Sequence, residues 1–311
     1  MNGCPMADLL TASPAQAPAA APGDPDVAAW LQEFAGPLPQ LVLRFEPAAS
    51  LLWLELKAEP KPVFTLTLIE SVARAQDAVI RFNDRFPDRP ILFLAYHAAG
   101  EVFSLGGDLD FYLDCLATND REGLARYARL ATRVIHRNTT GLEGRVITLA
   151  SVHARALGGG IDPARACNVM VAEEPATFCY PEINYNHVPI SAVPVLVRRA
   201  GALEAERILT SGETYSSAEM LAKGVLDAVV PQGGGRDWIR RFTAKAANSH
   251  KARMMLFHAF NARFGDLERE LGEAADTWVR HIMTLSPLEI SKLQRIAQAQ
   301  ERMLLRRPAR A

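Results

Sequence analysis

Two glycine-rich turns carry the residues whose types and spacing point most directly to chemistry. The first turn reads FSLGGDL and contains Gly107, and the second reads ALGGGIDPARAC and places three glycines just before Asp162 and Pro163. Glycine allows a backbone to approach a ligand closely, and proline suits the first position of a helix. Because amide groups at a helix start can hold a developing negative charge, the second turn presents donors beside a carboxylate.

Several known glycine motifs do not fit these turns. A GxGxxG dinucleotide fingerprint and a phosphate loop ending in GK[ST] are both absent from the sequence. A tight strand-to-helix turn without a ligand remains open for the second turn, and an Asp108-capped helix is compatible with the first. If the strands before the two turns are neighbours, the amides of Gly107 and Gly159 would converge on one carbonyl and form an oxyanion hole.

The surrounding segments alternate between strand and helix patterns. The segments QLVLRFEP and SLLWLELK predict a hairpin, residues 65–86 predict a helix, and RPILFLAY predicts a buried strand. A helix over residues 121–138 and the strands RVITLASV and NVMVAE follow. The alternation favours an α/β fold with a largely parallel sheet. After Pro181 helical patterns dominate, and VLDAVVP is the one segment that still reads as a strand.

Composition narrows the class of protein. The 311 residues include 34 Lys and Arg against 35 Asp and Glu, so the formal charge of -1 favours neither nucleic acid nor an anionic membrane as a partner. We expect no membrane span, because no apolar run reaches about 18 residues, and no signal peptide. Four scattered cysteines suit reduced thiols and a cytoplasmic location. The predicted organisation is a disordered Ala/Pro-rich leader (1–28), an α/β core (29–231) and a helical region (232–311).

The motifs together resemble a known superfamily. In order and spacing, FSLGGDL, ALGGGIDPARAC, VAEEPATFCYPEI and ILTSGETYSSAEMLAKGVLDAVVP resemble the crotonase (enoyl-CoA hydratase/isomerase) superfamily over residues 64–231. The form of the first turn, the VAEE pair and the N-terminal extension look most like the diffusible signal factor synthase branch. The resemblance implies a β/α spiral of ββα repeats, a homotrimer or hexamer formed through the C-terminal helices, and synthesis of a cis-2-unsaturated fatty acid signal in quorum sensing.

The resemblance also implies roles for individual residues. Gly107 and Gly159 would hold the thioester oxygen, while Asp162 and Glu182 would move protons on the acyl chain. The residues expected to bind substrate are Leu105, Gly106, Gly158, Leu109 and Phe111, with Leu196 also expected on the acyl pocket. The substrate would be a 3-hydroxyacyl thioester of acyl carrier protein or CoA, and no cofactor is expected beyond the phosphopantetheine arm of the substrate.

The chain departs from that branch at one carboxylate. The branch has glutamate where this sequence has Asp162, and a shift of about 1 Å at a reacting group costs on the order of 10²-fold in rate. Pro163 follows directly, and NHVPISAVP lacks the glycine-rich turn usual in the superfamily. Three functions therefore stay open: a 3-hydroxyacyl thioester dehydratase that also hydrolyses the thioester, a generic enoyl-CoA hydratase/isomerase, and a non-catalytic acyl-binding relative.

Other reactive residues are expected to have structural or surface roles, or fit such roles as well as a functional one. Glu173 and Glu174 lie side by side in a predicted strand and point to opposite faces, so we expect one or both to be solvated or ion-paired. His187 follows Glu182 by five positions and either lines the pocket or is structural. We expect no metal site, because the histidines form no HExxH-like set, and no hydrolase triad, because GxSxG is absent. Cys167 and Cys179 are expected to be buried thiols.

Overall fold

The structure is a computed structural model that describes residues 26–305 of the chain, with side chains described as far as residue 302. The predicted leader (1–28) lies almost entirely outside the described residues. Helix α1 (Val27–Ala35) already begins at residue 27, within the last two positions of the predicted leader. The Asp26 carboxylate caps it by accepting a hydrogen bond from the Ala29 amide at 3.1 Å.

The main sheet has six strands within residues 26–305, in the order β1-β2-β3-β4-β6-β9. The first two strands are antiparallel and form the predicted hairpin, and the others are parallel. The strands are β1 (Leu41–Glu46), β2 (Leu51–Leu56), β3 (Phe93–Ala98), β4 (Ile147–Val152), β6 (Val169–Glu173) and β9 (Ala228–Val230). The largely parallel sheet predicted from the alternating pattern is therefore confirmed.

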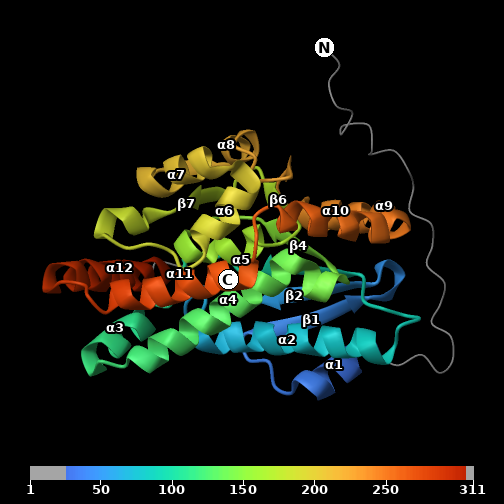
Figure 1. Cartoon of the computed structure of the whole chain (residues 1–311), viewed down its shortest axis with the longest axis horizontal. Coiled ribbons are helices and arrows are strands. Elements are labelled where there is room, and N and C mark those ends of the chain that lie inside the picture. The colour runs from blue at the N-terminus through green and yellow to red at the C-terminus, as the bar shows by residue number, and fades with distance from the viewer. Residues whose placement is uncertain (1–25, 306–311) are drawn as a thin grey trace, which may run out of the picture.

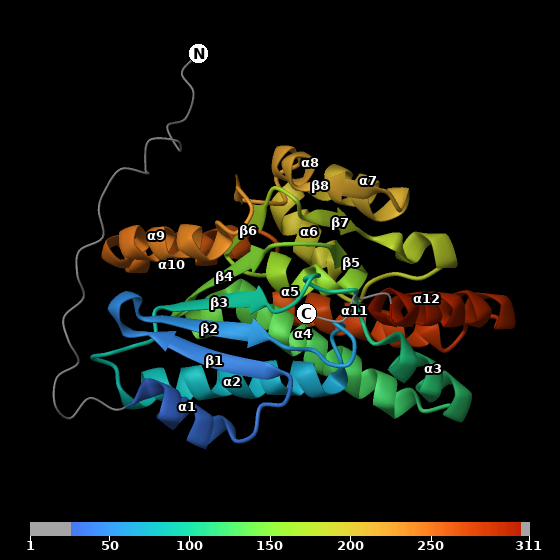
Figure 2. The same ribbon diagram turned by 180° about the vertical axis from the view of Figure 1, so that it is seen from behind.

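A second, smaller sheet lies beside the main one (Figure 2). In it β5 (Ala156–Leu157) pairs in parallel with β7 (Thr177–Cys179), and β8 (Thr214–Ser216) pairs antiparallel with β7. The second glycine turn follows β5 directly, and the segment that carries Glu182 follows β7. Because β5 and β7 are hydrogen-bonded neighbours, both segments leave the small sheet side by side.

Helices connect and cover the strands. Those of the first two thirds of the chain are α2 (Leu66–Arg85), α3 (Leu109–Thr118), α4 (Arg121–Gly144), α5 (Asp162–Arg165), α6 (Ala192–Ala200), α7 (Ala202–Ser211) and α8 (Ser217–Ala222). The C-terminal helices are α9 (Gly235–Ala246), α10 (His250–Ala262), α11 (Leu267–Ile282) and α12 (Pro287–Leu305). Helix α2 begins where Thr65 Oγ1 accepts from the Leu68 amide at 3.0 Å, and it ends just before Pro87, as the sequence predicts.

The two faces of the main sheet bury different helices because successive strand residues point to opposite sides. Leu52 and Leu54 face the large core beneath α2 and α4, whereas Leu51 and Trp53 face a separate core with α9 and α10. Figure 1 shows α1, α2 and α4 along one side of the sheet and α9 and α10 apart from them. The sheet is thus covered on both faces, which is typical of parallel strands.

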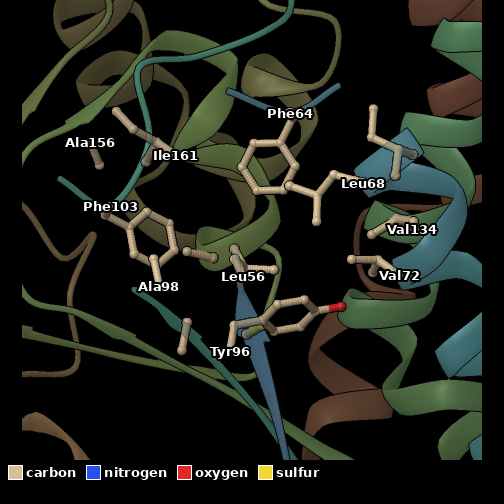
Figure 3. Close-up of a cluster of buried hydrophobic side chains, with 14 of the residues drawn as sticks. Leu56, Phe64, Leu68, Val72, Tyr96, Ala98, Phe103, Val134, Ala156 and Ile161 are labelled. Carbon is tan, nitrogen blue, oxygen red and sulfur yellow. The ribbon is translucent and has the colours of Figure 1, made fainter. Parts of the chain in front are cut away.

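Part of the large core continues into the site described below. Figure 3 shows Phe64 and Leu68 beside Val72 and Val134, with the Tyr96 ring nearby. The Tyr96 hydroxyl donates to Asn138 Oδ1 at 2.9 Å, which ties β3 to α4. Phe64, Val72 and Val134 also contribute to the wall of a cavity, so the packing of the core sets the shape of that wall.

Within the described residues, the segment after β9 consists of helices joined by short turns and contains no strand. Helix α11 packs against α4, and α12 packs against α3 of the same chain. None of the helices in the described part of the chain is long and apolar enough to cross a membrane. The C-terminal helices thus bury part of their apolar surface within the chain, and the predicted self-association remains a prediction.

Candidate active site

A largely apolar cavity of about 370 Å³ lies where the two glycine turns, the Glu182 segment and the C-terminal helices meet. Its lining includes residues from every one of those segments, among them Leu105, Tyr112, Gly159, Tyr185, Trp278 and Ile296. Asp162 and Glu182 are the carboxylates of this lining, and none of its residues is Lys or Arg. A cavity of this size and character suits an uncharged apolar ligand with a few directed polar contacts.

The first turn is held in a shape that only glycine adopts easily. Gly106 has φ 110°, and a Cβ atom at Gly107 would collide with the Tyr112 hydroxyl. The Phe64 amide donates to the Gly106 carbonyl at 2.9 Å, so the turn is tied to the start of α2. The Gly107 amide makes no hydrogen bond to any acceptor in the described residues. It is therefore a free donor at the cavity wall.

The second turn lies directly beside the first. The Leu157 amide donates to the Ser104 carbonyl at 2.9 Å, and a Cβ atom at Gly160 would collide with Ser104 Oγ. Gly158 has φ 50°, and a Cβ atom there would collide with Glu182 Oε1. At Gly159 the nearest atom to such a Cβ would be Pro189 Cβ at 3.9 Å. Gly158 and Gly160 are thus required for packing, whereas Gly159 keeps space open in the cavity.

Asp162 is the first residue of α5 and is 2% exposed. Its two oxygens accept hydrogen bonds from hydroxyl groups: Tyr180 donates to Oδ1 and Ser191 to Oδ2, each at 2.8 Å. Burial raises the pKa of Asp162 to about 7, although the Ser191 and Tyr180 hydroxyls act in the opposite direction. The carboxyl group is held rigidly and changes its charge near neutral pH.

Glu182 lies in a short 3-10 helix, η4 (Pro181–Tyr185), and is 7% exposed. Its Oε1 accepts from the Gly159 amide at 3.0 Å, and its Oε2 has no partner among the described residues. Burial raises the pKa of Glu182 to about 8, the charge of Asp162 raises it further, and the Gly159 amide opposes the shift. One oxygen of Glu182 is thus free to exchange a proton.

The two carboxyl groups form an interacting pair, because the charge of one disfavours the charge of the other. With pKa values of about 7 and about 8, both carboxyls lose their protons at or just above neutral pH, so in that range one can hold a proton while the other lacks one. A group that holds a proton beside a group that lacks one can act as general acid and general base. The site is therefore suited to moving protons on an apolar ligand.

The sequence-predicted site residues do not all reach the cavity. Leu105, Gly106, Gly158 and Leu109 line it beside the two proposed oxyanion donors and the two carboxylates. Phe111 is instead stacked on Tyr127 with ring centroids 5.7 Å apart, and Leu196 is buried in the large core. Neither belongs to the cavity wall, because α3 and α6 turn those positions toward neighbouring helices.

His187 lines the cavity and is 4% exposed. Its Nε2 accepts from Trp278 Nε1 at 3.2 Å, and burial, with the nearby His281, lowers the pKa of His187 to about 3. The ring is therefore neutral, and it anchors the segment after Glu182 to α11. The structural interpretation of His187 fits this contact, and the pocket-lining interpretation also holds.

The expectation that one or both of Glu173 and Glu174 are solvated or ion-paired is met by Glu174, whereas Glu173 is held by backbone amides. It is buried at the end of β6, and its carboxylate accepts from the amides of Gly233 and Gly235 at 2.6 and 3.2 Å, at the start of α9. Glu174 is exposed. Cys167 and Cys179 are buried free thiols. Among the described residues no group of three or more potential ligands is placed to hold a metal ion.

Sequence reasoning missed the groups that surround the carboxylates. The Tyr180 and Ser191 hydroxyls and the Trp278 indole reach the site from 3D packing, and no motif marks them. A weak signal existed for Tyr180 alone, because it lies two positions before Glu182 and directly after β7, the strand that pairs with β5.

Comparison with known proteins assigns the family. The sequence profile of the enoyl-CoA hydratase/isomerase family matches residues 96–291, more than half of the chain. The chain belongs to this family. Among curated relatives it is 33% identical over 139 residues to a mevalonyl-coenzyme A hydratase of Beauveria bassiana, covering 44% of this chain and 49% of that protein. It is 26% identical over 185 residues to a putative enoyl-CoA hydratase of Thermus thermophilus, covering 58% and 72%.

Solved structures agree on the fold. The enoyl-CoA hydratase of Bacillus halodurans superposes with a TM-score of 0.70 at 18% identity, covering 84% of this chain and 99% of that one. An enoyl-CoA hydratase/isomerase of Xanthobacter autotrophicus Py2 gives 0.70 at 18% identity, with 88% and 100% covered. The expected crotonase fold is thus confirmed. The matched stretch spans only about half the length of the first curated relative, so the activity is a matter for proposal.

Proposed function

We propose that the protein is an acyl-thioester enzyme of enoyl-CoA hydratase type that dehydrates a 3-hydroxyacyl thioester to a 2-enoyl thioester, or runs the reverse hydration. One observation carries the proposal. Asp162 and Glu182, both buried and with raised pKa, lie on the wall of one apolar cavity beside two glycine turns. Family membership supports the same reaction class.

In the proposed reaction the Gly107 and Gly159 amides hold the thioester oxygen, where charge develops when C2 loses a proton. Glu182 takes that proton on its unpartnered Oε2. The electron pair of the C2–H bond forms the C2–C3 double bond, and the C3–O bond breaks. Asp162 in its protonated form gives its proton to the leaving hydroxyl, which departs as water. The reactive form of the pair therefore has Asp162 protonated and Glu182 ionised, the less populated of the two one-proton arrangements because the pKa of Glu182 is the higher. The chemistry needs no cofactor beyond the phosphopantetheine arm of the substrate.

Glu182 must move for both amides to serve. Its Oε1 occupies the Gly159 donor in the absence of a ligand. A thioester oxygen that takes this donor would release the carboxylate toward C2 of the same ligand. The free Gly107 amide gives the carbonyl a first contact from which that exchange can proceed.

The proposal extends to a specific substrate carrier, product and oligomeric state. An acyl-carrier-protein substrate, subsequent thioester hydrolysis and a cis-2-unsaturated fatty acid product rest on the resemblance of the LGGD turn and the VAEE pair to the signal factor synthase branch. A homotrimer or hexamer rests on the same resemblance and on exposed apolar residues of α10, including Met255 and Phe260.

A second candidate is a non-catalytic acyl-binding protein, and one observation favours it. Both oxygens of Asp162 are satisfied by protein hydroxyls, and Glu182 Oε1 is satisfied by a protein amide. Apart from Glu182 Oε2, these oxygens have their partners without a ligand, as those of a purely structural pair of carboxyls would.

The deciding experiment incubates the purified protein with matched 3-hydroxyacyl-carrier-protein, 3-hydroxyacyl-CoA and 2-enoyl-CoA substrates and identifies the products by mass spectrometry. The proposal expects loss or gain of one water on at least one thioester. A free fatty acid would add the hydrolase step, and cis geometry would support the signal factor branch. No turnover of any thioester, together with measurable acyl-CoA binding, would favour the second candidate.

A further inference from the structure

Helix α12 supplies part of the cavity wall through Ile296, Ala299 and Gln300. Gln300 is buried, with 7% of its surface exposed, although it is a polar residue near the C-terminal end of the chain. Its Nε2 donates to the Leu105 carbonyl at 3.0 Å, across 195 positions of sequence. A buried amide is costly without a partner, so this bond defines where α12 docks.

The bond holds the Leu105 carbonyl of the first glycine turn, an acceptor that no other hydrogen bond of the described residues uses. The Leu105 amide donates to the Pro62 carbonyl at 2.7 Å, and the Phe64 amide donates to the Gly106 carbonyl at 2.9 Å. Both of these contacts come from the segment before α2. The Leu105 carbonyl, by contrast, accepts its hydrogen bond from α12. Only Gly106, whose φ is 110°, separates this carbonyl from the Gly107 amide in the chain.

The next residue of α12 reinforces the attachment. Glu301 lies 3.3 Å from the Lys61 ammonium, which also pairs with Asp110 in the first turn of α3. Lys61 is 8% exposed and immediately precedes Pro62. Gln300 thus holds the first glycine turn, and Glu301 pairs with a lysine that also pairs with the first turn of α3. Figure 2 shows α12 beside α3.

We propose that Gln300 is a positioning residue for the Gly107 amide: by fixing the Leu105 carbonyl it aims that free donor at the thioester oxygen. The inference rests on the proposed function, because Gly107 acts there as an oxyanion donor. It assigns α12 a role beyond covering the cavity, since the first turn is complete only when α12 is docked.

The test separates carbonyl recognition from acyl binding. Octanoyl-CoA and the octyl thioether of CoA share the chain and the CoA moiety, but only the thioester has a carbonyl for Gly107 to bind. Calorimetry would measure the affinity of the full-length protein for both ligands. Gln300→Leu should weaken the binding of octanoyl-CoA about 5- to 10-fold, which is the effect of one misplaced hydrogen bond. The affinity for the thioether should stay within about 2-fold of the wild-type value. Gln298→Leu is the matched control, because Gln298 is exposed on the same helix.

Each other outcome is informative. An equal loss for both ligands would mean that Gln300 only shapes the acyl cavity, and no loss for either would remove its role altogether; both results overturn the inference and leave the proposed function standing. If the wild-type protein binds octanoyl-CoA no better than the thioether, Gly107 is not an oxyanion donor, and the proposed mechanism fails with the inference.

A second variant covers the case in which Gln300→Leu does not fold. Gln300→Glu introduces a carboxyl that burial should keep protonated at low pH, when it can donate to the Leu105 carbonyl, but not once it ionises. The preference for thioester over thioether should then match the wild type at low pH and fall below it as the pH rises. A preference equal to the wild type at every pH would contradict the proposal.

Discussion

The Gly159 amide donates to Glu182 Oε1 at 3.0 Å, so a donor proposed for the thioester oxygen holds a carboxylate of the same site. A Cβ atom at Gly158 would collide with that oxygen, which shows how closely the Glu182 side chain lies against the turn. The carboxylate and the substrate oxygen therefore compete for one hydrogen bond. This competition links ligand binding to the charge of Glu182, and it can be tested by substitution.

Glu182→Gln should separate binding from turnover. Above about pH 8, where Glu182 is ionised, the neutral amide retains the shape of the side chain but accepts from Gly159 more weakly than the carboxylate, so a saturated acyl-CoA should bind at least as tightly as to the wild type. Turnover should fall about 10²-fold or more, because the proton acceptor is lost. Steady-state rates and calorimetry measure the two effects. Glu174→Gln, at an exposed position, is the control and should change neither.

Asp162→Asn should lower turnover by a similar factor of about 10². Asp162→Glu is the sharper probe, because both oxygens of Asp162 already lie 2.8 Å from the Tyr180 and Ser191 hydroxyls. An added methylene must displace one of these groups, so we expect turnover to fall. The free energy of unfolding should also fall, by about 1–3 kcal/mol. A rise in hydratase rate on Asp162→Glu would show instead that the site retains the geometry of its glutamate-containing relatives.

The carboxyl pair predicts an unusual dependence of stability on pH. Because the folded-state pKa values, about 7 for Asp162 and about 8 for Glu182, exceed those of unfolded carboxyls, the folded protein binds more protons than the unfolded chain between about pH 4 and 8. This contribution is full below about pH 4 and is lost as the pH rises toward 8, at about 1.4 kcal/mol per pH unit for each protonated carboxyl.

Chemical denaturation of the wild type and of the Asp162→Asn, Glu182→Gln double variant would measure this contribution. The difference between their free energies of unfolding should change with a slope of that sign across pH 5–8. Other ionisable groups are common to both proteins and cancel in the comparison. Parallel pH curves would mean that the buried pair does not hold an extra proton in the folded state.

The neighbouring glycines should respond differently to a side chain. Gly159→Val should fold nearly as well as the wild type, because a Cβ atom there meets only Pro189 at 3.9 Å, yet it should abolish thioester binding by filling the cavity. Gly158→Ala should destabilise the fold by about 1 kcal/mol or more, since φ is 50° and the methyl group collides with Glu182. Thermal denaturation and acyl-CoA titration distinguish the two. Normal turnover by Gly159→Val would rule out its role as a donor.

Self-association should depend on α10. Leu256 on this helix is 57% exposed, and Met255 and Phe260 beside it are 74% and 61% exposed. Light scattering should show an oligomer for the wild type and a smaller species for Leu256→Glu. Leu203→Glu is the matched control, because Leu203 is an equally exposed leucine, at 62%, on α7. A wild-type monomer at micromolar concentration would contradict the prediction.

Local patterns in the sequence determined much of this protein. Apolar periodicity identified the hairpin, the buried parallel strands and the helical C-terminal region, because it reports which face of each segment avoids water. The two glycine turns predicted a site, because a backbone that approaches a ligand needs glycine at defined positions, and the family resemblance pointed to Asp162 and Glu182 as its carboxylates.

Only the tertiary structure decided how the site is completed. The contacts of Asp162 with Ser191, of His187 with Trp278 and of Gln300 with Leu105 join residues 29, 91 and 195 positions apart. The same is true of Phe111 and Leu196, whose apolar character was evident although their neighbours were not. Periodicity defines the face that a segment buries but carries no information about which distant segment covers it, and that choice is made by the packing of the whole chain.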